Sequence, residues 1–247
     1  MENAITAALS NQIVLARALD ITANNIANQT TVGFKSEKAR FSEYLATIPG
    51  NAGPGNAGDD TVSLVYDLDS YTDFSTGGLQ QTHADLDFAI DGQGFFAVDT
   101  PQGIRYTRDG HFELNAFGDL VDRNGSPVLD DAGAPIFVDP ELGPVILSPE
   151  GELQQTGTPI ARLGVFTFFD QSVLQRAGFG QFATDEIAQP ALNPRIRQGF
   201  VETSNVAPVA SMTEMIEIMR AYESAAQILE TASELSRNAV QTLTQAA

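Results

Sequence analysis

The first thirty residues carry apolar side chains at the spacing of an amphipathic helix. Steps of three and four residues separate these positions, which places them along one stripe of a helix. The positions are Ile5, Leu9, Ile13, Ala16, Leu19, Ala23 and Ile26. Neither glycine nor proline occurs between residues 2 and 32. We therefore predict a long N-terminal helix with one apolar face.

The C-terminal end predicts a second and longer helix. Ser211 followed three residues later by Glu214 is a capping-box pattern, so we expect the helix to begin with Ser211 as its N-cap. The apolar residues that follow keep a spacing of three or four, close to a heptad seam. They are Met215, Ile218, Tyr222, Ala225, Leu229, Ala232, Leu235, Ala239 and Leu243.

Between the two helical ends, short segments rich in Val, Ile, Phe and Leu alternate with glycines, a rhythm typical of an antiparallel meander. The predicted class is therefore α+β, with a central all-β domain at residues 76–190 and a discontinuous helical domain formed by residues 1–33 and 206–247. Residues 34–75 and 191–205 are expected to be linking, extended segments. Within the first of these, residues 49–60 contain no large apolar side chain, which predicts a mobile surface loop.

A pair of terminal helices is expected to be only marginally stable by itself. Ordering some thirty residues costs more backbone entropy than nine mostly small apolar side chains return on burial. The helices therefore need neighbours. Two interpretations remain open: a helical hairpin that lies on the β domain of the same chain, or helices that fold together with the assembly of several chains.

Composition excludes several classes of function. The formal net charge of -19 produces a negative field that repels phosphate backbones and anionic lipid, so nucleic acid is not an expected partner. The chain has no cysteine, which excludes disulfides and thiolate nucleophiles. No apolar run is long enough to span a bilayer, and the start lacks the pattern of an export signal, so we expect neither membrane insertion nor a cleavable signal peptide.

Candidate chemical motifs have simpler explanations. Residues 92–97 (GQGFFA) fit a dinucleotide fingerprint, but the sequence continues as a strand where the fingerprint needs a helix. Residues 122–125 (DRNG) resemble part of a calcium loop but lack a correctly placed glutamate, which favours a turn. We therefore expect no cofactor at either motif.

The remaining candidates are titratable side chains. His83 and His111 lack the spacing of zinc ligands and are expected on the surface or in turns. Asp85, Asp87 and Asp91 alternate near a turn, where a solvated face is a more common arrangement than a catalytic carboxylate pair. We predict no catalytic residue, no metal ligand and no enzymatic activity.

Three asparagines near the end of the first helix are unusual, because helix propensity at these positions is poor. They are Asn24, Asn25 and Asn28, a few residues before Gly33. Capping and fraying of the helix end would explain them. Alternatively, their amides hydrogen-bond to adjacent subunits in a crowded helical core.

The same stretch resembles a known signature. Residues 22–35 (TANNIANQTTVGFK) are similar to the N-terminal motif of bacterial flagellar rod and hook proteins, although Val32 departs from the residue often found before its glycine. Residues 86–96 (LDFAIDGQGFF) and 106–110 (YTRDG) resemble the central β domain of that family. Residues 198–206 (QGFVETSNV), followed by 212–216 (MTEMI) and 220–223 (RAYE), resemble its C-terminal motif.

The resemblance implies a structural subunit of the flagellar basal-body rod. The terminal helices would then form an inner coiled-coil domain, and the polymer would be a helical drive shaft that transmits torque from motor to hook. Implied partners are further copies of the chain, other proximal and distal rod proteins and the flagellar type III export apparatus, with a periplasmic location reached without a cleavable signal. Chain length and the opening residues 1–5 (MENAI) are most similar to a proximal rod member, and a distal rod member is the alternative.

Subunit packing is expected to involve two groups of residues. One group matches the family motifs and the other lies on the apolar helix seams. The residues are Ile5, Leu9, Asn24, Asn25, Asn28, Gly33, Phe34, Gly199, Phe200, Ser204, Asn205, Met215, Leu229 and Leu235. A secreted acidic β-rich binding module is the rival hypothesis, and it would stay monomeric with dispensable termini.

Overall fold

The computed structural model describes residues 2–48, 60–148 and 151–245. Two compact units make up the chain. The helical unit comprises residues 1–27, 37–71 and 207–247, and the β unit comprises residues 28–36 and 72–206. The prediction of an α+β fold with helices at both ends and a β-rich centre is confirmed. The predicted mobile loop falls almost entirely on residues 49–59, which lie outside the described residues.

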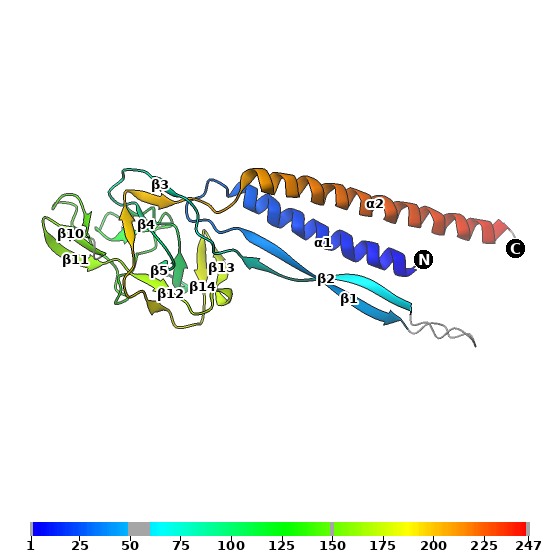
Figure 1. Ribbon diagram of the computed structural model, residues 1–247, viewed down its shortest axis with the longest axis horizontal. Coiled ribbons are helices and arrows are strands. Elements are labelled where there is room, and N and C mark those ends of the chain that lie inside the picture. The colour runs from blue at the N-terminus through cyan, green and yellow to red at the C-terminus, as the bar shows by residue number, and fades with distance from the viewer. Residues whose placement is uncertain (1, 49–59, 149–150, 246–247) are drawn as a thin grey trace. The chain divides into compact units, whose positions relative to one another are not determined.

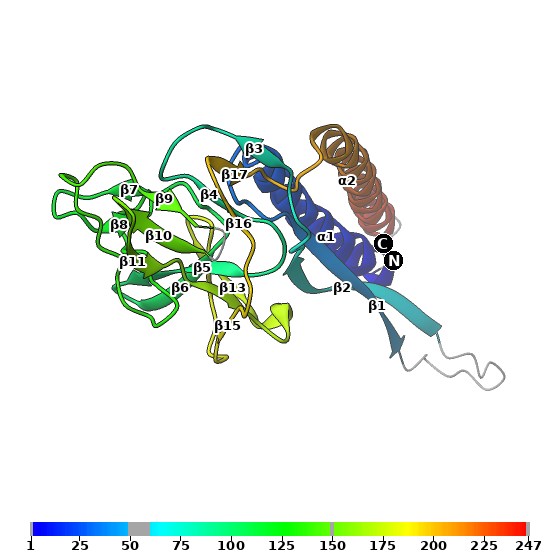
Figure 2. The same ribbon diagram turned by 60° about the vertical axis from the view of Figure 1, so that its left-hand side comes forward.

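Two long antiparallel helices dominate the helical unit. Helix α1 (Glu2–Ala27) and helix α2 (Pro208–Gln245) pack side by side, as Figures 1 and 2 both show. Strands β1 (Glu37–Ile48) and β2 (Asp60–Thr72) form a two-stranded sheet, and β1 packs against α1. The helical periodicity at the two ends of the chain therefore identified two elements that lie together.

The prediction that α2 begins at Ser211 was wrong. The helix begins at Pro208, and the backbone N–H of Ser211 donates to the carbonyl of Ala207 at 3.0 Å, within the first turn. Proline is favoured at the first helical position, because its missing N–H would have no intrahelical partner there and its fixed φ suits a helix. The proline therefore marks the start of the helix better than the capping-box pattern does.

The main sheet of the β unit has six antiparallel strands, and Figure 2 shows its central strands β5 and β6. Its strand order is β13 (Gln175–Gly178), β14 (Gln181–Ala183), β6 (Gly103–Thr107), β5 (Phe95–Thr100), β12 (Val165–Thr167) and β15 (Gln189–Pro190). A three-stranded sheet follows the order β11 (Thr158–Arg162), β10 (Glu152–Gln155) and β9 (Ile146–Leu147). A short 3₁₀ helix, η1, spans Gln171–Val173.

Three strand pairs complete the β unit, and two of them use residues that come just before α2. Strand β16 (Ile196–Gln198) pairs with β4 (Phe88–Ile90), and β17 (Phe200–Glu202) pairs with β3 (Leu79–Gln81). The third pair is β7 (Glu113–Leu114) with β8 (Leu120–Val121). Residues that we expected to form a linking segment therefore supply two strands to the β unit.

Alternate residues of β5 belong to two different apolar clusters, because successive side chains of a strand point to opposite faces. Phe96 packs with Phe88 and Phe112 in the larger cluster, and the rings of Phe96 and Phe112 lie 5.2 Å apart. Phe95 belongs to a second cluster with Phe182. The central strand thus holds the two faces of the β unit together.

The two glycine-containing motifs are turns, as predicted. Strand β5 begins at Phe95, directly after the glycines of residues 92–94, and no helix follows them. A Cβ on Gly94 would lie 2.5 Å from a methyl group of Val165, so packing explains this glycine. In the second motif the Asp122 carboxylate accepts hydrogen bonds from the backbone N–H groups of Asn124 and Ser126, which closes a local turn.

Candidate functional site

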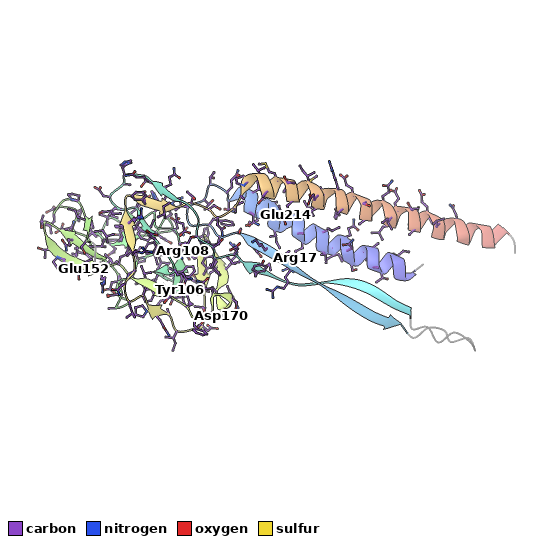
Figure 3. All side chains as sticks on the ribbon, in the orientation of Figure 1. Arg17, Tyr106, Arg108, Glu152, Asp170 and Glu214 are labelled. Carbon is purple, nitrogen blue, oxygen red and sulfur yellow. The ribbon has the colours of Figure 1, made fainter. Side chains whose placement is uncertain are left out.

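Three charged side chains from distant parts of the sequence meet inside the β unit. Lys35 Nζ donates to Glu202 Oε1 at 2.6 Å, and Arg108 Nη1 donates to Glu202 Oε2 at 3.1 Å. All three side chains are at most 2% exposed. Figure 3 labels Arg108 within the β unit. We call these three residues the ion cluster, in which one carboxylate serves two cations.

Further hydrogen bonds satisfy most of the polar atoms of the ion cluster. Lys35 Nζ also donates to the carbonyl of Ser75 at 2.7 Å, and Arg108 Nη2 donates to the carbonyl of Gly92 at 2.9 Å. The backbone N–H of Gly77 donates to Glu202 Oε1 at 2.8 Å. Burying charges is costly unless such bonds replace water. The ion cluster consequently joins five segments of the β unit.

Burial is the main influence on the pKa values of Lys35 and Arg108, the two cations of the ion cluster. Loss of water lowers the pKa of Lys35 and of Arg108, and the nearby Glu202 carboxylate opposes this shift in both cases. The Arg108 guanidinium carbon also lies 5.1 Å from the ring centroid of Phe95. Arg108 Nε is buried with no hydrogen-bond partner among the described residues. The carboxylate of Glu202 is therefore central to the stability of the cluster.

Two glycines allow the backbone to approach the ion cluster closely. Gly33 has a φ of 68° and donates its N–H to the carbonyl of Glu202 at 2.8 Å. A Cβ on Gly33 would lie 2.3 Å from the backbone nitrogen of Asp109. A Cβ on Gly77 would lie 1.9 Å from the carbonyl oxygen of Thr203. Larger residues at these positions would push the cluster segments apart.

Phe34, which we expected to pack between subunits, is buried within the β unit. The guanidinium carbon of Arg176 lies 5.0 Å from the Phe34 ring centroid and 5.8 Å from that of Phe182. Arg176 Nη2 also donates to the carbonyl of Lys35. The Gly-Phe-Lys end of the N-terminal motif is thus bound by β-unit side chains.

The C-terminal motif residues make contacts of the same kind. Asn205 Oδ1 accepts from the N–H of Ser36 at 2.7 Å, and Asn205 Nδ2 donates to the carbonyl of Asp73 at 2.7 Å. Ser204 Oγ accepts from the N–H of Val206 at 3.2 Å. The Asn205 side chain therefore connects the C-terminal motif to the segments of Ser36 and Asp73.

Gly199 and Phe200 lie between β16 and the end of β17. Gly199 has a φ of 73°, and its N–H donates to the carbonyl of Asp87 at 2.8 Å. Phe200 is half-buried, with the Arg197 guanidinium carbon 5.9 Å from its ring centroid. Both residues help to seat the C-terminal motif in the β unit.

The three asparagines of the N-terminal motif differ in their surroundings. Asn25 is buried, and its amide bonds to both backbone groups of Glu37: Nδ2 donates to the carbonyl at 2.7 Å and Oδ1 accepts from the N–H at 2.9 Å. Asn28 Oδ1 accepts from Thr31 Oγ1 at 3.2 Å, in the turn after α1. Asn24 is exposed. Asn25 thus connects α1 to the start of β1.

The predicted apolar stripe of α1 does not face inward along its whole length. Leu9 is 49% exposed and Ile13 is 61% exposed, whereas Ile5 is half-buried. The buried positions are Val14, Ala18, Thr22 and Asn25. The packed face of α1 is therefore rotated from the predicted stripe, and part of that stripe lies on the surface of the chain.

Helix α2 has one packed face and one exposed apolar face. Met215 and Leu229 of the predicted seam are half-buried, but Leu235 is 56% exposed. A second apolar stripe is exposed on the first part of the helix: Val209, Met212, Ile216 and Met219. We call this stripe the free face of α2. Contiguous exposed apolar residues of this kind typically mark a surface that binds other proteins.

Asp87 and Asp91, two of the titratable candidates, each pair with a side chain from another segment. Asp87 was expected on a solvated face, but it is buried, with Oδ1 2.6 Å from Nδ1 of a partly exposed His111. Asp91 forms an ion pair with Arg197 at 2.8 Å, while His83 is exposed. Among the described residues, no three side chains that could bind a metal ion lie together and no helix is long and apolar enough to cross a membrane.

Sequence reasoning missed the ion cluster. Its members lie 167 and 94 positions from Glu202, so no local pattern could pair them. A signal was nevertheless present, because each charge lies within two positions of an aromatic residue in a signature motif: Gly33-Phe34-Lys35, Tyr106-Thr107-Arg108 and Phe200-Val201-Glu202. Charged residues are rarely buried unless they are paired.

Comparison with known proteins gives three family matches in chain order. Residues 5–35 match the family "Flagella basal body rod protein". Residues 89–155 match "Flagellar hook protein FlgE/F/G D1 domain". Residues 197–242 match "Flagellar basal body rod FlgEFG protein C-terminal". The three matches include all members of the ion cluster.

Whole-length relatives agree with these matches. The chain is 42% identical to the flagellar basal-body rod protein FlgF of Caulobacter vibrioides, with 98% of each chain covered. It is 35% identical to FlgF of Mesorhizobium japonicum over 98% of each chain. It is 33% identical to the rod protein FlgG of Bacillus subtilis over 90% of this chain and 92% of the relative. The chain therefore belongs to the flagellar basal-body rod protein family.

Proposed function

We propose that this chain is a structural subunit of the proximal rod of the bacterial flagellar basal body, and that it has no enzymatic role. The observation that carries the proposal is the exposed apolar surface of its paired helices, which includes Leu9 and Ile13 on α1 and the free face of α2. The relatives named FlgF, which align along nearly the whole chain, support the same assignment. The distal rod is the second candidate, favoured by the similarity to FlgG.

The helical unit is the part that we propose to polymerise. Residues 1–27, 37–71 and 207–247 would act as one discontinuous assembly domain that is joined to the β unit of residues 28–36 and 72–206. Packing of α1 on α2 supports a coiled-coil-like pair within each subunit. The exposed stripes would then bind helices of neighbouring subunits, so that each contact repeats along a helical polymer.

The motif residues would contribute to this assembly in two ways. Leu9, Leu235 and Asn24 are exposed and can contact neighbours directly, while Ile5, Met215, Leu229 and Asn28 are half-buried. The remaining predicted residues are buried or half-buried and would act by holding the segments next to the helices: Asn25, Gly33, Phe34, Gly199, Phe200, Ser204 and Asn205.

The ion cluster suits the transmission of torque. Lys35 lies eight positions after the end of α1, and Glu202 lies six positions before the start of α2. Lys35 is paired with Glu202, and Glu202 is also paired with Arg108 of the β unit. Because close-packed, hydrogen-bonded groups deform little, a load applied to the helices would reach a rigid β unit.

Delivery to the rod would follow from the marginal stability of the helices. Exposed apolar stripes leave each helix partly without partners, so the helices would gain stability on assembly at the growing tip. We propose passage in an unfolded state through the flagellar type III apparatus to the periplasmic part of the basal body. Other proximal and distal rod proteins would be its neighbours there.

Genetic replacement tests the assignment. A strain that lacks its proximal rod protein and a strain that lacks its distal rod protein would each receive this chain, and basal bodies would be purified from both. We expect the chain in basal bodies and restored swimming in the first strain alone. Restoration in the second strain alone would favour the distal rod. Absence of the chain from basal bodies in both would overturn the proposal.

A further inference from the structure

The β unit contains a pocket that no described residue fills. Its volume is about 580 Å³, and its wall includes Leu86, Phe112, Leu114, Val138 and Val145. These residues come from the segment before β4, from the segment between β6 and β7, from β7 and from the chain before β9. An apolar pocket of this size would readily hold a large aliphatic or aromatic side chain.

The mouth of the pocket is acidic. Asp85 and Glu113 line the pocket and are exposed. The Asp87 carboxylate is buried against His111, so it contributes less to the charge at the mouth. Leu142 is 51% exposed and Ile146 is 61% exposed, and each is next in sequence to a lining residue. The pocket therefore suits a protruding apolar side chain with a basic residue close to it.

The β unit also has a set of strongly protruding apolar side chains. The described ones that are more than 80% exposed are Phe117, Phe169, Phe179, Ile187 and Leu192. Asp185 and Glu186 precede Ile187, and Asp170 follows Phe169, so both apolar side chains would meet repulsion at an acidic mouth. Phe179 has Arg176 within three positions, but that guanidinium is engaged with Lys35 and Phe34.

Leu192 has the required neighbour. It is 91% exposed in the loop between β15 and β16, and Arg195 follows three positions later. Arg195 is exposed, and its guanidinium forms no ion pair with a described residue. Three residues of fully extended chain span at most roughly 10 Å, and the bend at residues 192–193 shortens this distance toward the width of a cavity of this volume. Leu192 could thus enter the pocket while Arg195 reaches its acidic mouth.

We propose that Leu192 of one copy of this chain docks in the β-unit pocket of a second copy, with Arg195 paired to Asp85 and Glu113. Charge complementarity between the loop and the mouth favours this occupant. Every copy carries both the loop and the pocket, so the contact is heterologous and repeats from copy to copy. The inference rests on the proposed function, since it requires copies of the chain to assemble.

Disulfide trapping tests the contact. The chain has no native cysteine, so any disulfide between copies must involve the introduced thiols. The double variant Leu192→Cys/Pro140→Cys places one thiol on the loop and one at the exposed Pro140 of the pocket lining. Basal bodies from cells that express it would be oxidised and run on a non-reducing denaturing gel. We expect dimers and higher multimers of the chain, which reduction removes.

Matched variants separate this contact from chance collisions. Phe169→Cys/Pro140→Cys moves the loop thiol to another exposed site and should give little multimer. Adding Arg195→Glu to the trapping variant should lower the multimer yield several-fold, and a further Glu113→Lys should restore it. The charge reversals at Arg195 and Glu113 change exposed side chains, so they should leave folding unchanged. Circular dichroism of the purified chain would verify this.

The outcomes distinguish this proposal from the proposed function. If the chain is present in basal bodies but stays monomeric after oxidation, the docking is wrong and the rod assignment stands. Equal multimer yield from the Phe169→Cys control, or a band from a disulfide within one chain, would also overturn the docking. If the chain is absent from basal bodies, the proposed function itself fails.

Discussion

Replacing Glu202 by glutamine should destabilise the β unit more than any other single change in the ion cluster. The substitution keeps the size of the side chain but removes the one carboxylate that contacts both Lys35 and Arg108. Two buried cations would then lack their counter-charge. Breaking a buried ion pair from one side typically costs about 3–5 kcal/mol. For a chain of this size that is a fall in Tm of roughly 6–20 °C.

Lys35→Met provides the informative comparison, because it leaves Arg108 and Glu202 as a neutral pair. The carbonyl of Ser75, which loses the Lys35 hydrogen bond, still accepts from Asn205 Nδ2 at 3.2 Å. We therefore expect a smaller loss of roughly 1–2 kcal/mol. The exposed Glu113→Gln is the control, with an expected change within about 0.5 kcal/mol.

Urea unfolding of the purified full chain would measure the free energy of unfolding of the parent and of each of the three variants. Near-ultraviolet circular dichroism is a suitable signal, since Tyr106 is buried among phenylalanine rings in the core of the β unit. If buried charge decides stability, the loss in free energy of unfolding should be largest for Glu202→Gln, smaller for Lys35→Met and smallest for Glu113→Gln. A loss for Lys35→Met that equals or exceeds that for Glu202→Gln would refute the reasoning.

Three further predictions concern single positions. Gly77→Ala should lower the free energy of unfolding by roughly 1–3 kcal/mol, because its Cβ would lie 1.9 Å from the carbonyl oxygen of Thr203. Gly78→Ala is the control: its Cβ would lie 3.3 Å from the nearest atom, a side-chain oxygen of Thr203, so urea unfolding should show a smaller loss of stability. Burial raises the pKa of Asp109 above 3.8, so its contribution to stability is lost as pH rises through the folded-state pKa. The stability advantage of the parent over Asp109→Asn should therefore be larger at about pH 3 than at about pH 7 in urea titrations, and a pH-independent difference would contradict this. Asn25→Ala should remove both side-chain hydrogen bonds to Glu37 and speed exchange of the Glu37 amide hydrogen, and unchanged exchange would count against that link.

Sequence periodicity was sufficient to predict the elements but not their packed faces. Steps of three and four residues located both helices, since that spacing is a property of the helix itself. Whether Leu9 and Ile13 face a neighbour within the chain depends on where α2 and β1 lie, which no local pattern records. Apolar residues that must bind another chain look the same in the sequence as residues of an internal core.

The candidate site was predictable only through family motifs. Those motifs indicated Phe34, Gly199 and Asn205 as important, and the structure gives each a contact within the β unit. The pairing of Lys35 with Glu202 joins residues 167 positions apart, which chain topology alone brings together. The capping-box pattern at Ser211 predicted the wrong helix start, because Pro208 begins the helix three residues earlier.

Incorporation of a free-face variant tests the central claim, assembly through the helices, most directly. Ile216→Asp puts a charge on the free face of α2, and the exposed neighbour Glu217→Gln is the control. Basal bodies would be purified from cells that contain equal amounts of each variant, and the chain would be quantified. We predict normal incorporation of Glu217→Gln and severe loss of Ile216→Asp, with the helix content of the purified chain unchanged. Normal incorporation of Ile216→Asp would contradict assembly through this face.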